Sequence, residues 1–280
     1  MVILTDFSEA AYRAAGYGCE LAGCLGIKRI VLYHAYQPLG TAGTPEFVGI
    51  NDNGEQLYLE GMEALALLHD RLKPMIAKDT KIDLIAEDIL LSSMAELIRK
   101  RNLKEKVEII VMGVSGKSAL EKFLVGSTTT QVLKEGEWPV LVVPEDTILG
   151  RGIKTIALTI DLKEIDMQSI RQVYEFLDAL PGELLVVNVE QQEREKYSPE
   201  MKETIADLHK LLKKYNPEFI YLTGDDVVKE ILCFANERHA SLIIAIHQKH
   251  GFLSSLFHKS VTKQLAYNSN VPLLALPVFG

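Results

Sequence analysis

Short apolar runs alternate with longer amphipathic segments along the whole chain, and this alternation predicts an α/β fold. In the first half the apolar runs are rich in Val and Ile, which favour buried strands. The strands expected there lie at 2–5, 28–36, 82–87, 107–112 and 138–144. Segments of helical periodicity separate them, at 8–25, 55–78, 93–102 and 128–135, and residues 37–54 read as a loop. Strands that alternate with helices build a parallel sheet wound on both faces.

The same pattern returns after residue 152, so the chain contains an internal repeat. The strands expected in the second half lie at 154–161, 184–189, 218–224, 241–246 and 272–277. When 107–144 is set on 240–277, no gap is needed over 38 positions and 8 residues are identical. We therefore predict two Rossmann-like domains, at 1–146 and 152–280. Each is expected to hold a parallel five-stranded sheet with helices on both faces, and 280 residues suffice for two such domains.

Composition narrows the class of protein. A net charge of −8 without a basic stripe argues against a nucleic-acid partner. Three cysteines fit a reducing compartment, and Cys19 and Cys24 are expected to be small core residues rather than a redox pair. The sequence shows no secretory signal and no apolar run near 18 residues, so we expect a cytoplasmic protein without a membrane partner.

A glycine-punctuated segment after the strand at 107–112 carries the strongest chemical signal. Gly113, Gly116 and Gly126 are followed at once by Ser127, Thr128 and Thr129, where a short helix is expected to begin. Glycines permit a close backbone approach and a positive φ, and free N–H groups at a helix N-terminus attract a phosphate. The alternative is that the glycines only form turns and Ser127 only caps a helix. A P-loop is excluded, because the glycine that it requires five residues before Gly116 is replaced by Val111.

Gly113 and Gly116, nine further residues and then Gly126-Ser127 resemble the ATP-binding signature of universal stress proteins. The start of the chain, ILTDFSEAA, is similar to that family's first strand and its Asp-containing turn, and WPVLVVP at 138–144 is similar to its last strand. The resemblance implies a tandem universal stress protein with adenine nucleotide alpha hydrolase-like domains. Its implied ligand is ATP, with or without Mg²⁺. The nucleotide-binding residues that it implies are Thr5, Asp6, Ala35, Met112, Gly113, Ser115, Gly116, Gly126, Ser127, Thr128 and Thr129.

Asp6 and the histidines of the chain can also be interpreted as structural or exposed residues that bind no ligand. Asp6 is alternatively part of the N-cap region of the next helix. His34, near the end of the second strand, is expected to be a structural residue. His247, His250 and His258 have a spacing that permits zinc, but no Cys or carboxylate completes the set, so an exposed polar loop is favoured and no metal ligands are assigned.

The phosphate-type loop is lost in the second half. Gly113, Gly116 and Gly126 align with Ile246, Lys249 and Lys259. A β-branched Ile does not comfortably take a positive φ, and longer side chains would fill the space that phosphates need. We therefore expect ATP in the first half only.

Three functions remain open from the sequence. The first is a nucleotide-dependent regulatory protein of the stress response, without catalytic residues and with an unidentified protein partner. The second is a slow ATPase or nucleotide hydrolase, in which Asp6 holds Mg²⁺ and Lys117 reaches the phosphates, although no general base is evident and Ser115 stands where a His or Glu would have to act. The third is a structural module that binds no nucleotide.

The last strand of each half is short, apolar and bracketed by prolines. An unpaired edge strand favours aggregation, so we expect 140–143 and 273–276 to pair antiparallel within one chain as a pseudo-dimer of the two halves. The resemblance supports this, because single-domain members of the family commonly dimerise through this strand. The alternative is pairing with another chain, which would make a homo-oligomer obligatory.

Overall fold

The computed structural model describes residues 1–36, 53–88, 96, 109–115, 138–162, 167–190, 198–246 and 271–277. The first half contains β1 (Val2–Leu4), α1 (Glu9–Leu25), β2 (Arg29–Tyr36), α2 (Asn53–Leu72), β3 (Lys81–Asp88), β4 (Ile110–Val114) and β5 (Val140–Pro144). The second half contains β6 (Thr155–Thr159), α5 (Met167–Leu177), β7 (Glu183–Glu190), α6 (Pro199–Leu212), β8 (Glu218–Thr223), α7 (Val227–Glu237), β9 (Leu242–Ile246) and β10 (Leu273–Leu276). Of the helix expected at 93–102 only Glu96 is described, and it is helical. The helix expected at 128–135 and most of the loop expected at 37–54 lie outside the described residues.

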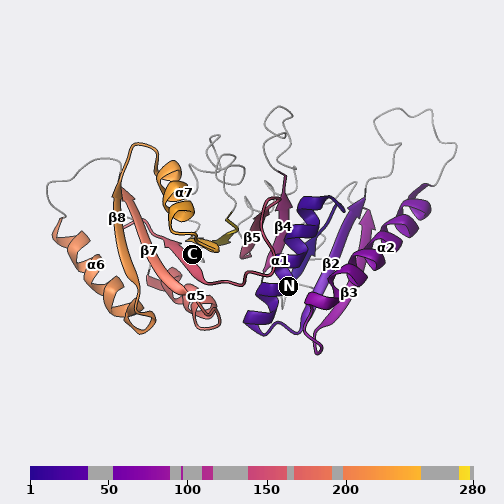
Figure 1. Ribbon diagram of the computed structural model, residues 1–280, viewed down its shortest axis with the longest axis horizontal. Coiled ribbons are helices and arrows are strands. Elements are labelled where there is room, and N and C mark those ends of the chain that lie inside the picture. Colours follow the sequence, from indigo (N-terminus) through magenta and orange to yellow (C-terminus); the bar gives the residue numbers. More distant parts are fainter. Residues whose placement is uncertain are drawn as a thin grey trace.

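The described strands form one ten-stranded sheet that runs through both halves, in the order β3-β2-β1-β4-β5-β10-β9-β6-β7-β8 (Figure 1). Neighbouring strands are parallel within each half. β5 and β10 join the halves and pair antiparallel, with Leu274 opposite Leu141. The predicted pairing of the two last strands within one chain is therefore confirmed.

Alternate residues of each strand face opposite sides of the sheet, as a pleated strand requires. Ile3 packs in one apolar cluster with Ala14 and Leu21 of α1, whereas Val2 and Leu4 belong to a second cluster on the other side. The first cluster continues through the second half to α5 and α6, so the two halves share a core. α7 covers the opposite face there, where Ile231 packs with Ala157 and Ile243.

Helix α1 begins and ends at the residues that the sequence indicates. The Ser8 side chain accepts a hydrogen bond from the Ala11 N–H at 3.2 Å, which caps the N-terminus. Gly26 takes a left-handed conformation, with φ 66°, and ends the helix. Cys19, in the middle of α1, is buried, and burial raises the pKa of its thiol to about 12, so it behaves as an apolar core residue.

Helix α2 ends earlier than its periodicity predicts. The expected helix at 55–78 passes through Pro74, whereas α2 stops at Leu72 and a 3-10 turn follows at Lys73–Met75. Proline has no N–H to donate, and its ring clashes with the carbonyl four residues earlier in an α-helix.

No helix in the described part of the chain has the length and apolar character of a membrane-spanning segment.

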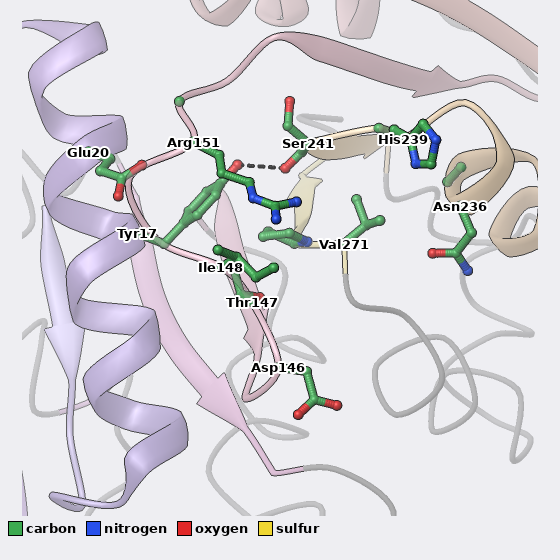
Figure 2. A pocket seen from close by; sticks show the side chains of 14 residues that line it. Tyr17, Glu20, Asp146, Thr147, Ile148, Arg151, Asn236, His239, Ser241 and Val271 are labelled. Carbon is green, nitrogen blue, oxygen red and sulfur yellow. Dashed lines mark hydrogen bonds between the residues drawn. The ribbon is translucent and has the colours of Figure 1, made fainter.

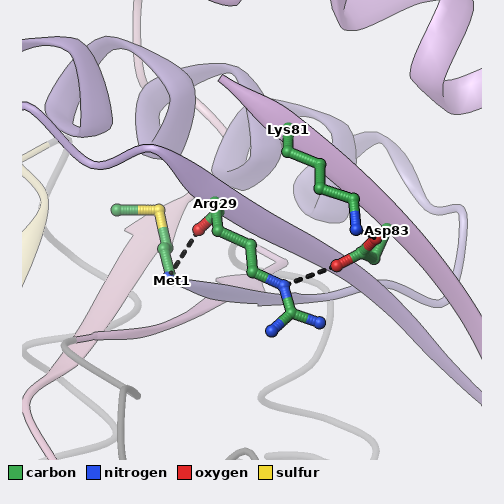
Figure 3. Close-up of polar contacts among 4 residues, drawn as sticks. All are labelled: Met1, Arg29, Lys81 and Asp83. Atoms are coloured by element: carbon green, nitrogen blue, oxygen red, sulfur yellow. Dashed lines mark hydrogen bonds and ion pairs between the residues drawn. The ribbon is translucent and has the colours of Figure 1, made fainter. Parts of the chain in front are cut away.

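The outer strand β3 carries charged side chains that tie it to β2 (Figure 3). The Asp83 carboxylate contacts Arg29 Nε at 2.5 Å and Lys81 Nζ at 3.1 Å. Partial desolvation raises the pKa of Asp83, but the hydrogen bonds from Arg29 and Lys81 outweigh it, so the pKa lies below its ordinary value. The N-terminal ammonium of Met1 donates to the Arg29 carbonyl at 3.0 Å. Charges on an edge strand oppose further strand pairing.

Candidate functional site

The candidate site lies at the carboxyl ends of β1 and β4, where the strand order of the first half reverses. β1 pairs with β2 on one side and with β4 on the other, and Ile3 lies opposite both Leu32 and Val111. Continued by two residues, this register places Thr5 between His34 and Gly113. Ligands of open parallel sheets bind in the crevice at such a switch point.

A tight turn connects β1 to α1 at this edge. The Phe7 N–H donates to Thr5 Oγ1 at 3.0 Å, and the Ser8 N–H donates to Asp6 Oδ1 at 3.0 Å. Phe7 itself has a φ of 64°, a left-handed conformation that costs a residue with a Cβ roughly 1–2 kcal/mol. Strain of this kind is typical of functional sites, where the surrounding contacts hold it in place.

Asp6 supports the helix cap without being the cap. Its Oδ1 accepts the Ser8 N–H and also the Ser8 hydroxyl, at 2.6 Å, and Ser8 in turn caps α1. Asp6 is exposed, and within the described part of the chain its second oxygen, Oδ2, makes no hydrogen bond. Both interpretations of Asp6 therefore remain compatible, since one carboxylate oxygen orders the turn and the other is free to meet a ligand or a Mg²⁺ ion.

His34 holds the end of β1 in place. Its Nδ1 lies 2.9 Å from the Thr5 carbonyl oxygen, which can only accept, so Nδ1 carries the hydrogen. The imidazole also contacts the Phe7 ring, with 4.4 Å between centroids. In the second half Asn188 Nδ2 donates to the Ile160 carbonyl at 3.0 Å, which repeats the arrangement with an amide. His34 has the structural role that the sequence predicts.

Gly113 is a strand residue, which corrects its assignment to the loop. It belongs to β4, lies opposite Val143, and is not among the described glycines with positive φ, which are Gly26, Gly150 and Gly152. A Cβ at residue 113 would lie 2.4 Å from the carbonyl oxygen of Ala10 and 2.8 Å from the backbone nitrogen of Ala11. Gly113 is therefore required for the close approach of α1 to β4, and not for a left-handed turn.

The other predicted residues divide into three groups. Ala35 is half-buried near the end of β2, and Ser115 is exposed just beyond β4, so both lie at the same edge as Thr5 and Asp6. The Met112 side chain is buried in the core beneath this edge, which leaves its backbone for any ligand contact. The remaining predicted residues lie outside the described part of the chain: Gly116, Gly126, Ser127, Thr128, Thr129, His247, His250 and His258.

Sequence reasoning missed the part that Phe7 plays in this turn. An aromatic residue rarely takes a positive φ, so nothing in its local sequence indicates the left-handed conformation.

Tyr36, at the end of β2, adds a further polar group near this edge. Partial burial and the Asp88 carboxylate raise the pKa of Tyr36, so its phenol stays protonated near neutral pH.

The profile of the universal stress protein family matches residues 1–144 and 152–277. The chain belongs to the universal stress protein family. A universal stress protein of Methanocaldococcus jannaschii is 32% identical over 149 residues, which cover 51% of this chain and 80% of that protein. A universal stress protein of Thermus aquaticus is 30% identical over 146 residues, which cover 51% of this chain and 96% of that protein.

Solved structures agree with the tandem arrangement of this universal stress protein. The crystal structure of a universal stress protein from Archaeoglobus fulgidus has a TM-score of 0.73 at 17% identity, over 99% of this chain and 95% of that chain. A universal stress protein structure from Pseudomonas aeruginosa has a TM-score of 0.59 at 14% identity, over 98% of this chain and 91% of that chain. At these identities the likeness establishes the fold alone.

Proposed function

We propose that this universal stress protein binds one ATP per chain, in its first domain, and acts as a nucleotide-dependent regulator in the cytoplasm. The domain boundaries proposed are 1–146 and 152–280. The observation that supports this most directly is the strained turn at 5–8, which faces the start of the glycine motif across the β1–β4 switch point. Asp6, whose Oδ2 makes no hydrogen bond with the described residues, and the exposed Ser115 lie at the same edge of the sheet.

The second domain offers a different surface at the corresponding position. Ile246 ends β9 where the first domain has Gly113, and Asn188 replaces His34. Ser260 and Asp161 are retained in the sequence, but the three glycines are not. Ile246 packs against the shared apolar core, as the Cβ direction at Gly113 also requires, so this difference concerns helix packing. The loss of the glycines at 116 and 126, which align with Lys249 and Lys259, is what supports a single ATP site.

A regulatory role is favoured over a dedicated enzyme because phosphoryl transfer requires charge stabilisers and a positioned water. His34 is held at the turn by the Nδ1 hydrogen bond to the Thr5 carbonyl, and its Nε2 edge lies beside Gly61 of α2. Asp6 is suited to holding Mg²⁺ on bound phosphates rather than to abstracting a proton. Hydrolysis is therefore expected to be far slower than the roughly 1–1,000 s⁻¹ of dedicated enzymes.

Matched substitutions in the two domains test this proposal by calorimetric titration with MgATP. Asp6→Asn keeps Oδ1 as the acceptor for Ser8 and removes the charge, so the fold persists while the affinity falls by about tenfold or more. Gly126→Lys should weaken binding more strongly, because a side chain would occupy the space of the phosphates. The controls are Asp161→Asn and Lys259→Gly in the second domain, which should leave the affinity unchanged. If the variants of both domains lost affinity for MgATP equally, or if none lost affinity, the assignment of the ATP site to the first domain would be refuted.

A multiple-turnover assay separates the regulator from the hydrolase. The purified chain is incubated with MgATP, and released phosphate is followed over many equivalents. We expect no turnover beyond the first equivalent on the time scale of a dedicated enzyme. Sustained release that Asp6→Asn abolishes would establish the enzyme instead.

A further inference from the structure

A polar pocket of about 260 Å³ lies between the two halves, away from the crevice of the candidate ATP site (Figure 2). Its walls come from the middle of α1, from the segment 146–152 that connects the halves, and from the end of α7 with the starts of β9 and β10. The first half, the connecting segment and the second half therefore all contribute to the walls of the pocket.

Hydrogen bonds between the halves fix these walls. The Tyr17 hydroxyl of α1 donates to the Ser241 carbonyl at 2.8 Å, and Glu20 Oε1 accepts the Gly150 N–H at 2.5 Å. Gly150 and Gly152 flank Arg151 with φ of 79° and 68°, which residues with a Cβ rarely adopt. The connecting segment is thus held in one conformation, and that conformation directs Arg151 over the pocket (Figure 2).

The charged group that extends over the pocket has no ion-pair partner in the described part of the chain. The Arg151 guanidinium makes no ion pair with the described residues and extends toward the side where Asn236 and His239 lie (Figure 2). A guanidinium offers hydrogen-bond donors and no acceptor.

We propose that this interdomain pocket binds a small monocarboxylate metabolite, anchored by Arg151. The planar guanidinium donates two parallel hydrogen bonds to a carboxylate, and the Asn236 amide in the same lining offers a further donor. The pocket lies below the usual range of roughly 300–1,000 Å³ for drug-sized ligands, so the ligand is small. The Glu20 and Asp146 carboxylates in the same lining disfavour a polyanion, which separates this site from one for a nucleoside triphosphate.

Because the ligand would contact both halves and the connecting segment, its binding is measurable at assigned backbone amides. The 280-residue chain, without nucleotide, is titrated with acetate, pyruvate and L-lactate up to about 10 mM while the amides of Gly150, Gly152 and His239 are followed by NMR. Inorganic phosphate is the comparison anion. We expect saturable shifts at these three amides with at least one carboxylate, and weaker shifts with phosphate.

Two substitutions locate the ligand. Arg151→Met removes the charge at similar length and should abolish the saturable shifts. Asn236→Leu removes the amide of an exposed residue in the lining, so it leaves the fold intact and should weaken binding about three- to tenfold. Lys154→Met is the control, because Lys154 is exposed on the same segment but does not line the pocket.

Three outcomes would overturn the proposal. The first is the absence of saturable shifts with any carboxylate. The second is unchanged affinity in Arg151→Met, and the third is binding of phosphate but of no carboxylate.

Discussion

Gly113 of β4 and Ala10 of α1 approach so closely that a Cβ on the glycine would lie 2.4 Å from the Ala10 carbonyl oxygen. Backbone atoms cannot move aside as the end of a flexible side chain can. We therefore expect Gly113→Ala to lower the free energy of unfolding by at least about 1–3 kcal/mol, whether or not nucleotide is present. Urea denaturation measures this directly.

Gly23, in the same helix α1, is the matched control for Gly113. A Cβ there meets no heavy atom within 4 Å. Gly23→Ala should raise the free energy of unfolding by roughly 0.5–1 kcal/mol, because alanine has less freedom to lose on folding. If Gly113→Ala were as well tolerated as Gly23→Ala, the steric role of Gly113 would be wrong.

The strands could be predicted from the sequence because their runs of Val, Ile and Leu are buried, as in the β5 segment VLVVP. The pairing of β5 with β10 followed from the need to cover two apolar edges. Helix α2 was predicted too long because periodicity was followed through Pro74, and the proline decides the end instead.

The candidate site was predictable only in part. The sequence brings Asp6 and Gly113 into one hypothesis through the glycine motif, but it does not reveal that a Cβ at Gly113 would collide with α1. The left-handed Phe7 is equally hidden, since its conformation is imposed by contacts with Thr5 and His34. The interdomain pocket joins Tyr17 to Ser241, which lie 224 residues apart, and no local pattern links them.

His34 is expected to stabilise the turn through its hydrogen bond to Thr5. His34→Ala leaves the Thr5 carbonyl without this donor and removes the contact with Phe7, so it should cost roughly 1–3 kcal/mol of unfolding free energy and weaken MgATP binding. His34→Asn copies the residue that performs the same task in the second half, Asn188, and should recover part of both losses. Thermal denaturation of the two variants measures the change in stability, and calorimetric titration measures the change in MgATP affinity. An asparagine variant no better than the alanine variant would contradict this role.

Leu274 is fully buried in β10 opposite Leu141 of β5, where the two halves join. Leu274→Asp places an unpaired charge in this core, so we expect the β5–β10 pairing to open and the freed edges to associate between chains. Light scattering after size-exclusion chromatography should show oligomers or aggregates. Leu67→Asp, on the 63% exposed Leu67 of α2, should leave the chain unchanged in size. Identical elution of the two variants would show that the pairing of β5 with β10 is not needed to keep the chain from associating.

Asp83 should make the stability of the first half depend on pH. Its pKa is depressed in the folded state, so its contribution is present above the ordinary carboxyl pKa of about 3.9 and is lost as the pH falls through the lower, folded value. Asp83→Asn should therefore be less stable than the parent chain near pH 7, and the difference should disappear at the acid end of a pH series of urea denaturations. A difference that stays constant with pH would show that the Arg29 and Lys81 contacts do not act through the charge of Asp83.

The central claim is that one of the two domains binds ATP. Calorimetric titration of the unsubstituted 280-residue chain with MgATP gives the stoichiometry directly. We predict one site per chain, which disappears in Gly126→Lys and persists in Lys259→Gly. Two equivalent sites per chain, or a single site that survives Gly126→Lys, would contradict the account.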